Sequence, residues 1–426
     1  MSPEQEHARK GRGLRRNFAS SLVGNTVYRL AQWLLIVVIA RWGDVEMVGA
    51  FALAQAISAP VFLTVGLNLR AARTTDVSGH WSAQQYHQLR LILNALSIVL
   101  SGLIAWAVSP TATFMLVALA LALSKGSEAA SQVTYGYLQY RERLDLVSRS
   151  LLLRAAAGPL PFAGVLVATQ DLAMSCLALA VGWVAVTLLH DRVVEARLRT
   201  SDDEIREPSP EATLLTLAKA ALPLGVTAGL GSITANVPRY GVQIILGTAS
   251  LGLFAALAYL GQIIAMITGS LADSLLGRLA RTAQAGDPRA FMRSLTLLSG
   301  FGMAVSLFTI AVAALVGAPL TKLLLGSEYV NQPVLLTLLA GAALVTFQRT
   351  LGRGLQGGRR FRDILVMDVT TAAATLAGAA WAIPSFGLMG AAATLGIGYA
   401  IGSLVGIHLV RHMVVSMKKG TDPARV

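Results

Sequence analysis

The sequence predicts an all-α polytopic membrane protein with twelve transmembrane helices arranged in two six-helix lobes. Of its 426 residues, 54% are hydrophobic and only 13% are charged, whereas a soluble domain carries roughly 25% charged residues. This composition excludes an ordinary water-soluble enzyme. A membrane-spanning helix needs about 20 apolar residues, and the apolar residues of this chain gather into twelve segments of about that length.

The predicted spans follow one another with short connections. The first six cover residues 17–40, 47–67, 88–108, 111–135, 144–168 and 172–190. The other six cover residues 214–236, 240–271, 290–315, 330–351, 363–383 and 388–410. The chain is therefore predicted to divide into a basic arm (1–16), an N-terminal lobe (17–190), a polar linker (191–213), a C-terminal lobe (214–411) and a tail (412–426).

The basic residues predict how the chain is oriented. Most of the 35 Lys and Arg residues lie in the arm, the even-numbered connections and the tail, and the odd-numbered connections hold only Arg41, Arg239 and Lys322. Because translocation is biased against basic loops, we expect a multi-pass protein of the plasma (inner) membrane with both termini in the cytoplasm. The arm is expected to be retained and not cleaved. The net charge of +13 is then mostly a consequence of this topology. It would also attract anionic lipid headgroups, and we expect no nucleic-acid partner.

The two halves of the chain resemble each other. Because six spans per half is an even number, the halves are predicted to be related by a pseudo-two-fold axis along the membrane normal, with a site between them. The alternative is a helical scaffold whose halves share only their composition. The matching positions, in chain order, are Gly49 with Gly252, Arg70 and Arg73 with Arg278 and Arg281, Leu138-Gln139 with Leu355-Gln356, and Asp145 with Asp363.

Polar side chains follow one face of the first predicted span. Asn25, Arg29 and Gln32 lie at helical spacing, and the opposite face is apolar. An ionisable group in hydrocarbon is costly and usually faces a cavity or a partner. We therefore expect Arg29 to face a wetted central cavity. The alternative is a structural arginine that extends to the interface or bridges to a neighbouring helix.

Two further cations are predicted deep in the first half. Lys125 and Glu128 are three residues apart in the fourth span and can form an ion pair, with Gln132 one turn further on. The pair is either a neutralising bridge or a group that a proton or the substrate opens. Arg154 is the other deep cation, in a fifth span that Pro159 is expected to bend.

Other charged residues lie near the ends of the predicted spans. Anchoring of cytoplasmic ends explains most of them, and a minority are candidates for a gate of ion pairs between the halves or for coupling to H⁺ or Na⁺. The sequence shows neither a phosphate-binding loop nor a zinc-protease motif, so we expect no enzyme activity, no metal site and no cofactor. The candidate gate or coupling residues are Arg149, Asp145, Asp363, Asp368, Arg349 and Arg353.

These features together resemble the polysaccharide flippases, the Wzx-like branch of the MOP exporter superfamily, over residues 17–411. The resemblance rests on Asn25 in a polar-faced first span, on the turn Ala40-Arg41-Trp42-Gly43 before the segment that begins at Gly49, on the two Leu-Gln turns and on the two six-span halves.

The resemblance implies a MATE-like pair of six-helix lobes around a central cavity and alternating access between the two sides of the membrane. It also implies that a polyprenyl-diphosphate-linked oligosaccharide is flipped to the outer leaflet for cell-surface polysaccharide biosynthesis. Arg29, Lys125 and Arg154 would hold the diphosphate, and amides such as Asn25, Gln32 and Gln132 would contact the sugars. A polysaccharide polymerase and glycosyltransferases would be partners.

Two alternatives stay open. A MATE-like cation-coupled drug or metabolite antiporter would share the fold, but that branch commonly has an acidic residue in the first span, where this chain has Arg29. A membrane scaffold for a polysaccharide synthase would not require three deep cations in one lobe. The lipid II flippase branch fits less well, because it usually carries two C-terminal spans beyond the twelve predicted here.

Overall fold

The computed structural model describes residues 3–76, 80–199, 212–261, 279, 281–283 and 285–418. Within these ranges every regular element is a helix. Ten helices are long and apolar enough to cross a membrane, and Thr248–Leu260 is a shorter apolar helix. The chain divides into two compact units, Met1–Gly229 and Leu230–Val426, which are described in turn.

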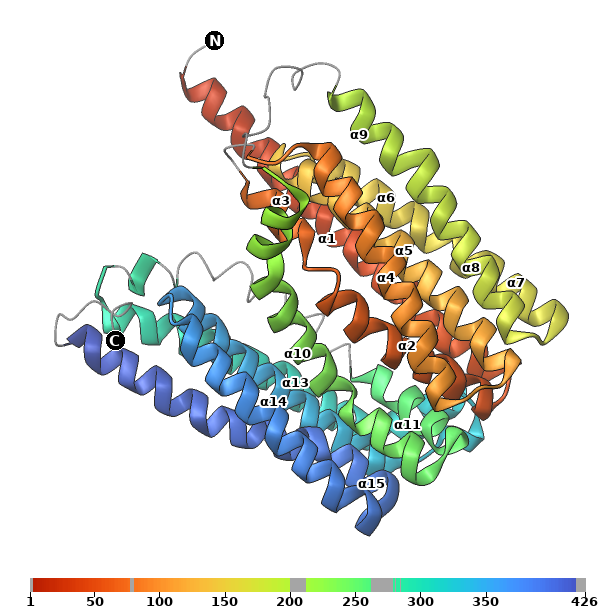
Figure 1. Cartoon of the computed structure of the whole chain (residues 1–426). Coiled ribbons are helices and arrows are strands. Elements are labelled where there is room, and N and C mark those ends of the chain that lie inside the picture. The colour runs from red at the N-terminus through yellow and green to blue at the C-terminus, as the bar shows by residue number, and fades with distance from the viewer. Residues whose placement is uncertain are drawn as a thin grey trace. The chain divides into compact units, whose positions relative to one another are not determined.

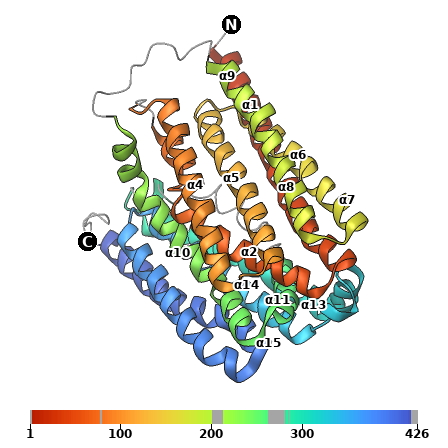
Figure 2. The ribbon, with the colours of Figure 1, turned by 45° about the vertical axis from the view of Figure 1, so that its right-hand side comes forward.

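The first unit is a bundle around one central helix (Figure 1). Helix α5 packs against α2, α3, α4, α6, α8 and α9, and Figure 2 shows α4 and α5 side by side. The elements are α1 (Pro3–Trp42), α2 (Val45–Thr64), α3 (Leu69–Thr75), α4 (Ala83–Val108), α5 (Ala112–Tyr140), α6 (Leu144–Ala157), α7 (Pro159–Thr169), α8 (Leu172–Val186), a π-helical turn (Thr187–Asp191), α9 (Arg192–Arg199) and the start of α10 (Leu214–Leu246).

Two breaks interrupt the spans of the first unit. Between α2 and α3 the chain turns through Leu67 and Asn68, whose φ angles are +56° and +44°, a conformation that L residues rarely adopt. Between α6 and α7, Pro159 occupies the first helical position and ends the preceding helix. The predicted bend of the fifth span is therefore confirmed, and the first break lies at Leu67, where the second span was predicted to end.

The sixth span extends further than the sequence analysis predicted. Helix continues through the π-helical turn and α9 to Arg199, whereas the linker was predicted to begin at residue 191. Asp191 and Glu195 look like linker residues by composition, but both are buried against α5. Their four-residue spacing places them on one helix face, which explains why the helix persists. The predicted linker residues 200–211 lie outside the described ranges.

The second unit is also helical in its described residues. Its elements are the rest of α10, α11 (Thr248–Leu260), α13 (Pro288–Leu324), a 3₁₀ turn (Ser327–Tyr329), α14 (Gln332–Gly357) and α15 (Phe361–Lys418). Helix α10 runs through Arg239, where a loop was predicted, and ends at Gly247, whose φ is +86°. That angle suits glycine. Residues 262–271 of the predicted eighth span lie outside the described ranges.

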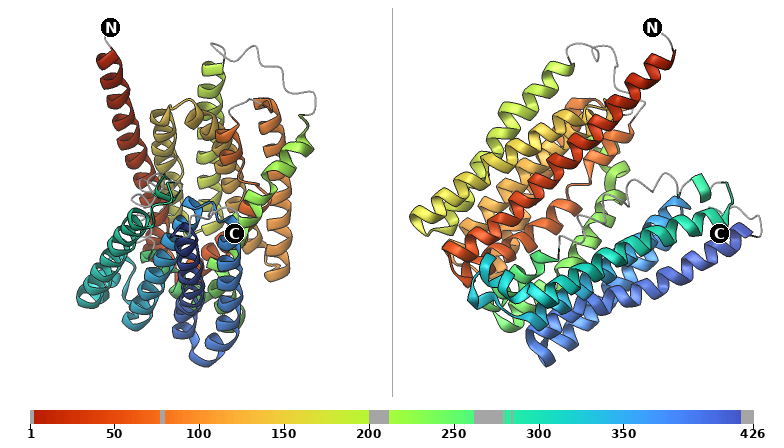
Figure 3. Two further views of the ribbon diagram at one scale, coloured as in Figure 1. Left: turned by 90° about the vertical axis from the view of Figure 1, so that its left-hand side faces the viewer. Right: turned by 180° about the vertical axis from the view of Figure 1, so that it is seen from behind.

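Helix α15 contains two predicted spans. It is 58 residues long, but Gly387 has non-helical angles (φ 57°, ψ −133°). The helix folds back on itself there, as Figure 3 shows. Eleven of the twelve predicted spans then correspond to long helices. The remaining one is the predicted eighth span, part of which is the shorter helix α11. The twelve-helix prediction therefore agrees with the described residues.

The same turn closes α5 in one unit and α14 in the other. After α5, the Arg143 N–H donates to the Leu138 carbonyl (2.8 Å), and Glu142 has a φ of +55°. After α14, the Arg360 N–H donates to the Leu355 carbonyl (2.9 Å), and Arg359 has a φ of +57°. This six-residue bond with a left-handed residue is a Schellman turn. The match that the sequence showed at the two Leu-Gln pairs is thus also a match of backbone geometry.

Candidate functional site: a basic cavity in the first unit

A cavity of about 430 Å³ lies among α2, α3, α4 and α5 of the first unit. We call it the basic cavity, because its described lining holds three cationic side chains and one carboxylate. The polar lining residues are Asn68, Arg70, Arg90, Lys125, Glu128 and Gln132, and the others are Ala59, Phe62, Leu63, Gly66, Leu69 and Ala129.

Helix α5 presents Lys125, Glu128 and Gln132 to the basic cavity. Their spacing of three and then four residues puts all three on one helix face. The Lys125 ammonium lies 3.1 Å from a Glu128 carboxylate oxygen, and each side chain is about one-fifth exposed (22% and 21%). The predicted ion pair therefore forms, and it lines a cavity instead of being packed inside the protein.

Helix α3 supplies Arg70. Its guanidinium donates to Gln132 Oε1 (2.9 Å) from Nη1 and to Gln139 Oε1 from Nε and Nη2 (3.2 and 3.1 Å). The break at Leu67 and Asn68 is what redirects the chain so that Arg70 reaches α5. Two amides thus orient this arginine, and neither of them neutralises its charge.

Helix α4 supplies Arg90, which the sequence analysis did not single out. Arg90 is 4% exposed, and its Nη2 donates to the Gly66 carbonyl at 2.8 Å. Its buried Nε has no hydrogen-bond partner among the residues that the structure describes. A signal was present in the sequence, because Arg90 is followed at helical spacing by Asn94, Ser97 and Ser101, all of them buried.

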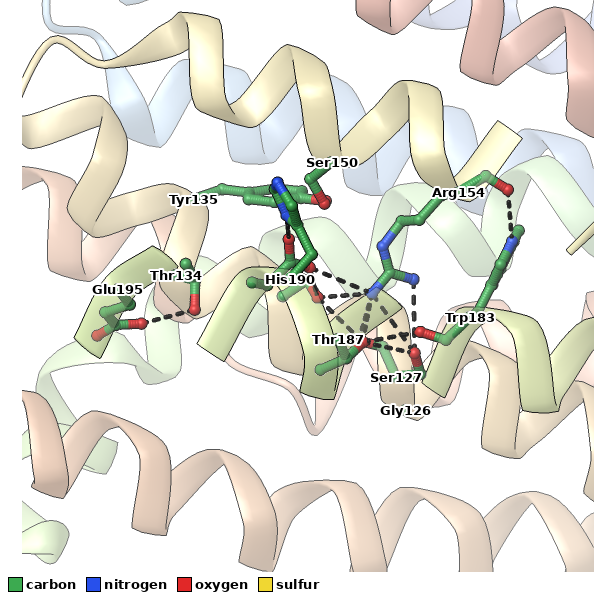
Figure 4. Close-up of polar contacts among 12 residues, drawn as sticks. Gly126, Ser127, Thr134, Tyr135, Ser150, Arg154, Trp183, Thr187, His190 and Glu195 are labelled. Carbon is green, nitrogen blue, oxygen red and sulfur yellow. Dashed lines mark hydrogen bonds and ion pairs between the residues drawn. The ribbon is translucent and has the colours of Figure 1, made fainter. Parts of the chain in front are cut away.

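A different face of α5 carries a second polar set, which we call the polar seam. Ser127, Ser131 and Thr134 on α5 face Thr187, Asp191 and Glu195 on the sixth span. The hydroxyls of Ser127 and Thr187 are 2.8 Å apart, Ser131 donates to Asp191, and Thr134 donates to Glu195 at 2.6 Å. Figure 4 shows this seam from the side.

Arg154 belongs to the polar seam and not to the basic cavity. It is fully buried, and its Nη2 donates to the Ser131 hydroxyl at 2.6 Å and to the Thr187 hydroxyl (Figure 4). The same nitrogen lies 3.6 Å from Asp191. Trp183 Nε1 donates to the Arg154 carbonyl at 3.1 Å. The protein itself therefore supplies the partners of Nη2, whereas the buried Nε of Arg154 has none among the described residues.

Glu195 ends the polar seam and joins four helices. Arg73 Nη2 donates to it at 2.6 Å, and His87 Nε2 lies 3.0 Å from both of its carboxylate oxygens. Arg73 Nη1 also donates to the Val133 carbonyl at 3.0 Å. The sequence analysis missed Glu195, although the four-residue spacing of Thr187, Asp191 and Glu195 predicts one shared helix face.

The predicted residues of the first span lie elsewhere in the unit. Arg29 and Asn25 are exposed, and Gln32 is half-buried. The Asn25 amide donates to the Ser21 carbonyl at 2.8 Å, within its own helix. None of the three lines the basic cavity. The structure thus brings Lys125, Glu128 and Gln132 together, buries Arg154 behind them and leaves the α1 residues apart.

The candidate gate and coupling residues have partners within their own units where partners are described. Asp145 pairs with Arg143 (3.0 Å) and Asp363 with Arg360 (2.7 Å), and Arg353 donates to Gln356 at 3.2 Å. Their role in a gate stays a prediction. Of the remaining candidates, two are exposed and one is half-buried: Arg149, Arg349 and Asp368. Among the described residues, no group of three or more His, Cys, Asp and Glu could hold a metal ion.

Comparison with known proteins gives matches in sequence and in fold. No protein-family model matches the chain. A capsular polysaccharide biosynthesis protein of Staphylococcus aureus, CapF, is 23% identical over 385 residues, which are 90% of this chain and 95% of that protein.

Solved structures match nearly the whole chain. An inward-facing multidrug resistance MATE family transporter of the MOP superfamily has a TM-score of 0.73 at 13% identity, over 94% of this chain and 99% of that one. A MOP superfamily transporter from Pyrococcus furiosus, described by the reverse polarity of its binding pocket, has a TM-score of 0.67 at 13% identity, over 95% and 96%. The chain therefore has the fold of the MOP-superfamily transporters, and the predicted fold class and the resemblance to this superfamily are confirmed.

Proposed function

We propose that this chain, which has the fold of MOP-superfamily transporters, moves a polyprenyl-diphosphate-linked oligosaccharide from the cytoplasmic to the outer leaflet by alternating access. The observation that carries the proposal is the basic cavity, in which Arg70, Arg90 and Lys125 outnumber the single carboxylate of Glu128. The similarity to a capsular polysaccharide biosynthesis protein supports the same class of substrate.

The charge of the cavity suits an anionic headgroup. A diphosphate cannot enter hydrocarbon unless fixed cations and hydrogen-bond donors replace its water. Arg70 and Arg90 offer guanidinium groups, which match phosphate oxygens in pairs. Lys125 offers a point charge that a phosphate can draw away from Glu128, so the ion pair would open when the substrate binds.

The test is flipping of a polyprenyl-diphosphate oligosaccharide in proteoliposomes that contain the full-length protein. Charge-assisted contacts to phosphate contribute roughly 1.5–3 kcal/mol each, so Lys125→Gln should weaken substrate binding by about tenfold to a hundredfold. Arg411→Gln, which changes an exposed arginine near the end of α15, is the matched control and should flip normally.

Two other outcomes would change the proposal. Uptake of hydrophobic cations in place of this lipid would favour the MATE-like antiporter, since a cavity with excess positive charge should repel them. Absence of any transport, with the protein still required for polysaccharide assembly by its polymerase and glycosyltransferases, would favour the scaffold. We propose in addition that the protein lies in the inner membrane and that both of its termini are cytoplasmic.

A further inference from the structure

The basic cavity has two unlike walls. Arg70, Arg90 and Lys125 come from α3, α4 and α5, and they form its cationic wall. Phe62 and Leu63 come from α2, and with Ala59 and Leu69 they form an apolar wall. A cavity for a free anion would not need an apolar wall, and a cavity for a hydrocarbon would not need three cations.

The cationic wall includes an arginine that the protein leaves incompletely satisfied. Arg90 is more than nine-tenths buried, yet its Nε has no hydrogen-bond partner among the described residues. A buried donor without a partner costs about 1–3 kcal/mol, and more when the group is charged. The Nε atom is itself closed off from the cavity, but the lining carries three cations and one carboxylate, an excess of positive charge that an anionic ligand would neutralise. The lining therefore points to an anion as one part of the ligand.

The cavity offers little for a sugar. Its described amides are Asn68 and Gln132, and the Gln132 oxygen already accepts from Arg70. The side chains of Phe62 and Leu63 cannot hydrogen-bond with hydroxyl groups.

We infer that the basic cavity binds the lipid end of the substrate, namely the phosphate groups together with the first isoprenoid units, and that this binding does not depend on the glycan. The inference rests on the proposed function. The phosphates lie against Arg70, Arg90 and Lys125, and the proximal chain lies against Phe62 and Leu63. The carrier lipid is then recognised by one unit, whatever sugars it bears.

The experiment measures binding of four probes to the purified full-length protein in one detergent: farnesyl diphosphate, farnesol, inorganic diphosphate and a free oligosaccharide. Farnesyl diphosphate should bind at least about tenfold more tightly than farnesol or inorganic diphosphate, because only it meets both walls. The free oligosaccharide should not bind.

Two variants separate the walls. Leu63 is 44% exposed, so the Leu63→Asn protein should fold normally. Its affinity for farnesyl diphosphate should fall about tenfold, and its affinity for inorganic diphosphate should not change. Arg90→Gln keeps a donor for the Gly66 carbonyl and should lower the affinity for both farnesyl diphosphate and inorganic diphosphate. Lys125→Gln, at a partly exposed side chain, gives the same readout if Arg90→Gln fails to fold. Arg293→Gln, an exposed arginine on α13, is the control and should change nothing.

Three results would overturn the inference. Equal affinity for farnesyl diphosphate and inorganic diphosphate, with Leu63→Asn silent, would mean that the apolar wall takes no part. Equal competition by a short-chain phosphatidylglycerol would make the cavity a general lipid-phosphate site. Binding of the glycan-bearing lipid alone, with normal flipping, would refute this inference and leave the proposed function standing. Tight farnesyl diphosphate binding without flipping would refute the proposed function instead.

Discussion

The replacement Arg154→Met tests whether this deep cation is a ligand group or part of the polar seam. Methionine fills much of the same volume but removes every donor of the guanidinium. Asp191 would then remain buried without the cation 3.6 Å away, and Ser131 and Thr187 would lose a shared donor. The effect should therefore fall on stability first and on transport only as a consequence.

The magnitude follows from the burial of both partners. Arg154 and Asp191 are 0% and 3% exposed, and breaking a buried ion pair by removing one partner costs about 3–5 kcal/mol. Because His190 Nδ1 (2.9 Å) and the Ser131 hydroxyl still contact Asp191, the lower end of this range applies. For a domain of 150–250 residues each kcal/mol shifts Tm by about 2–4 °C, so we expect a loss on the order of 10 °C. A double change, Arg154→Met with Asp191→Leu, should recover much of it, because no unpaired charge is left.

Thermal unfolding of the purified protein in detergent measures this directly. Arg149→Met on the same helix changes an exposed arginine and should unfold like the unmodified protein. The flipping rate of each variant is then compared at a temperature where all variants remain folded. An Arg154→Met protein with unchanged Tm and lost flipping would refute the reasoning and make Arg154 a group that binds substrate.

Three other predictions concern the same unit and the membrane topology. Glu195→Gln should lower Tm by several degrees, since Arg73 loses its buried carboxylate, and a Tm within one degree of the original would contradict this. Gly66→Ala should weaken farnesyl diphosphate binding, because an added Cβ would press on the Phe62 carbonyl and lie 2.9 Å from the Arg90 guanidinium; unchanged affinity would argue against that contact. Reporter fusions at Arg360 should report cytoplasm and fusions at Ser385 the outside, and a reversal of either would exclude the predicted orientation.

Hydropathy predicted most of the fold because a bilayer constrains sequences strongly. Each span must bury its backbone polar groups in a helix, so helix positions follow from apolar length alone. The same pattern cannot locate a helix end that is fixed by side-chain partners. It placed the end of the sixth span before Asp191, since it counted this residue and Glu195 as linker, although tertiary contacts bury both.

The site was predictable only where one helix carries it. Lys125, Glu128 and Gln132 share a face of α5, and periodicity revealed that face. Arg70 reaches the same cavity through a turn at Leu67, a residue that does not favour positive φ. Whether a deep arginine lines a cavity or pairs with an aspartate depends on which neighbour each helix face meets, and that information is tertiary.

Helix α5 has one face on the basic cavity and another on the polar seam, and this has a genetic consequence. Because α5 has contacts on both faces, it cannot rotate or slide without disturbing both sets of contacts. A change in the segment from Thr187 to Glu195, which contacts α5 on a face away from the cavity, should therefore also displace Lys125. A random-mutagenesis screen for transport defects should recover substitutions in that segment, although none of its residues lines the basic cavity.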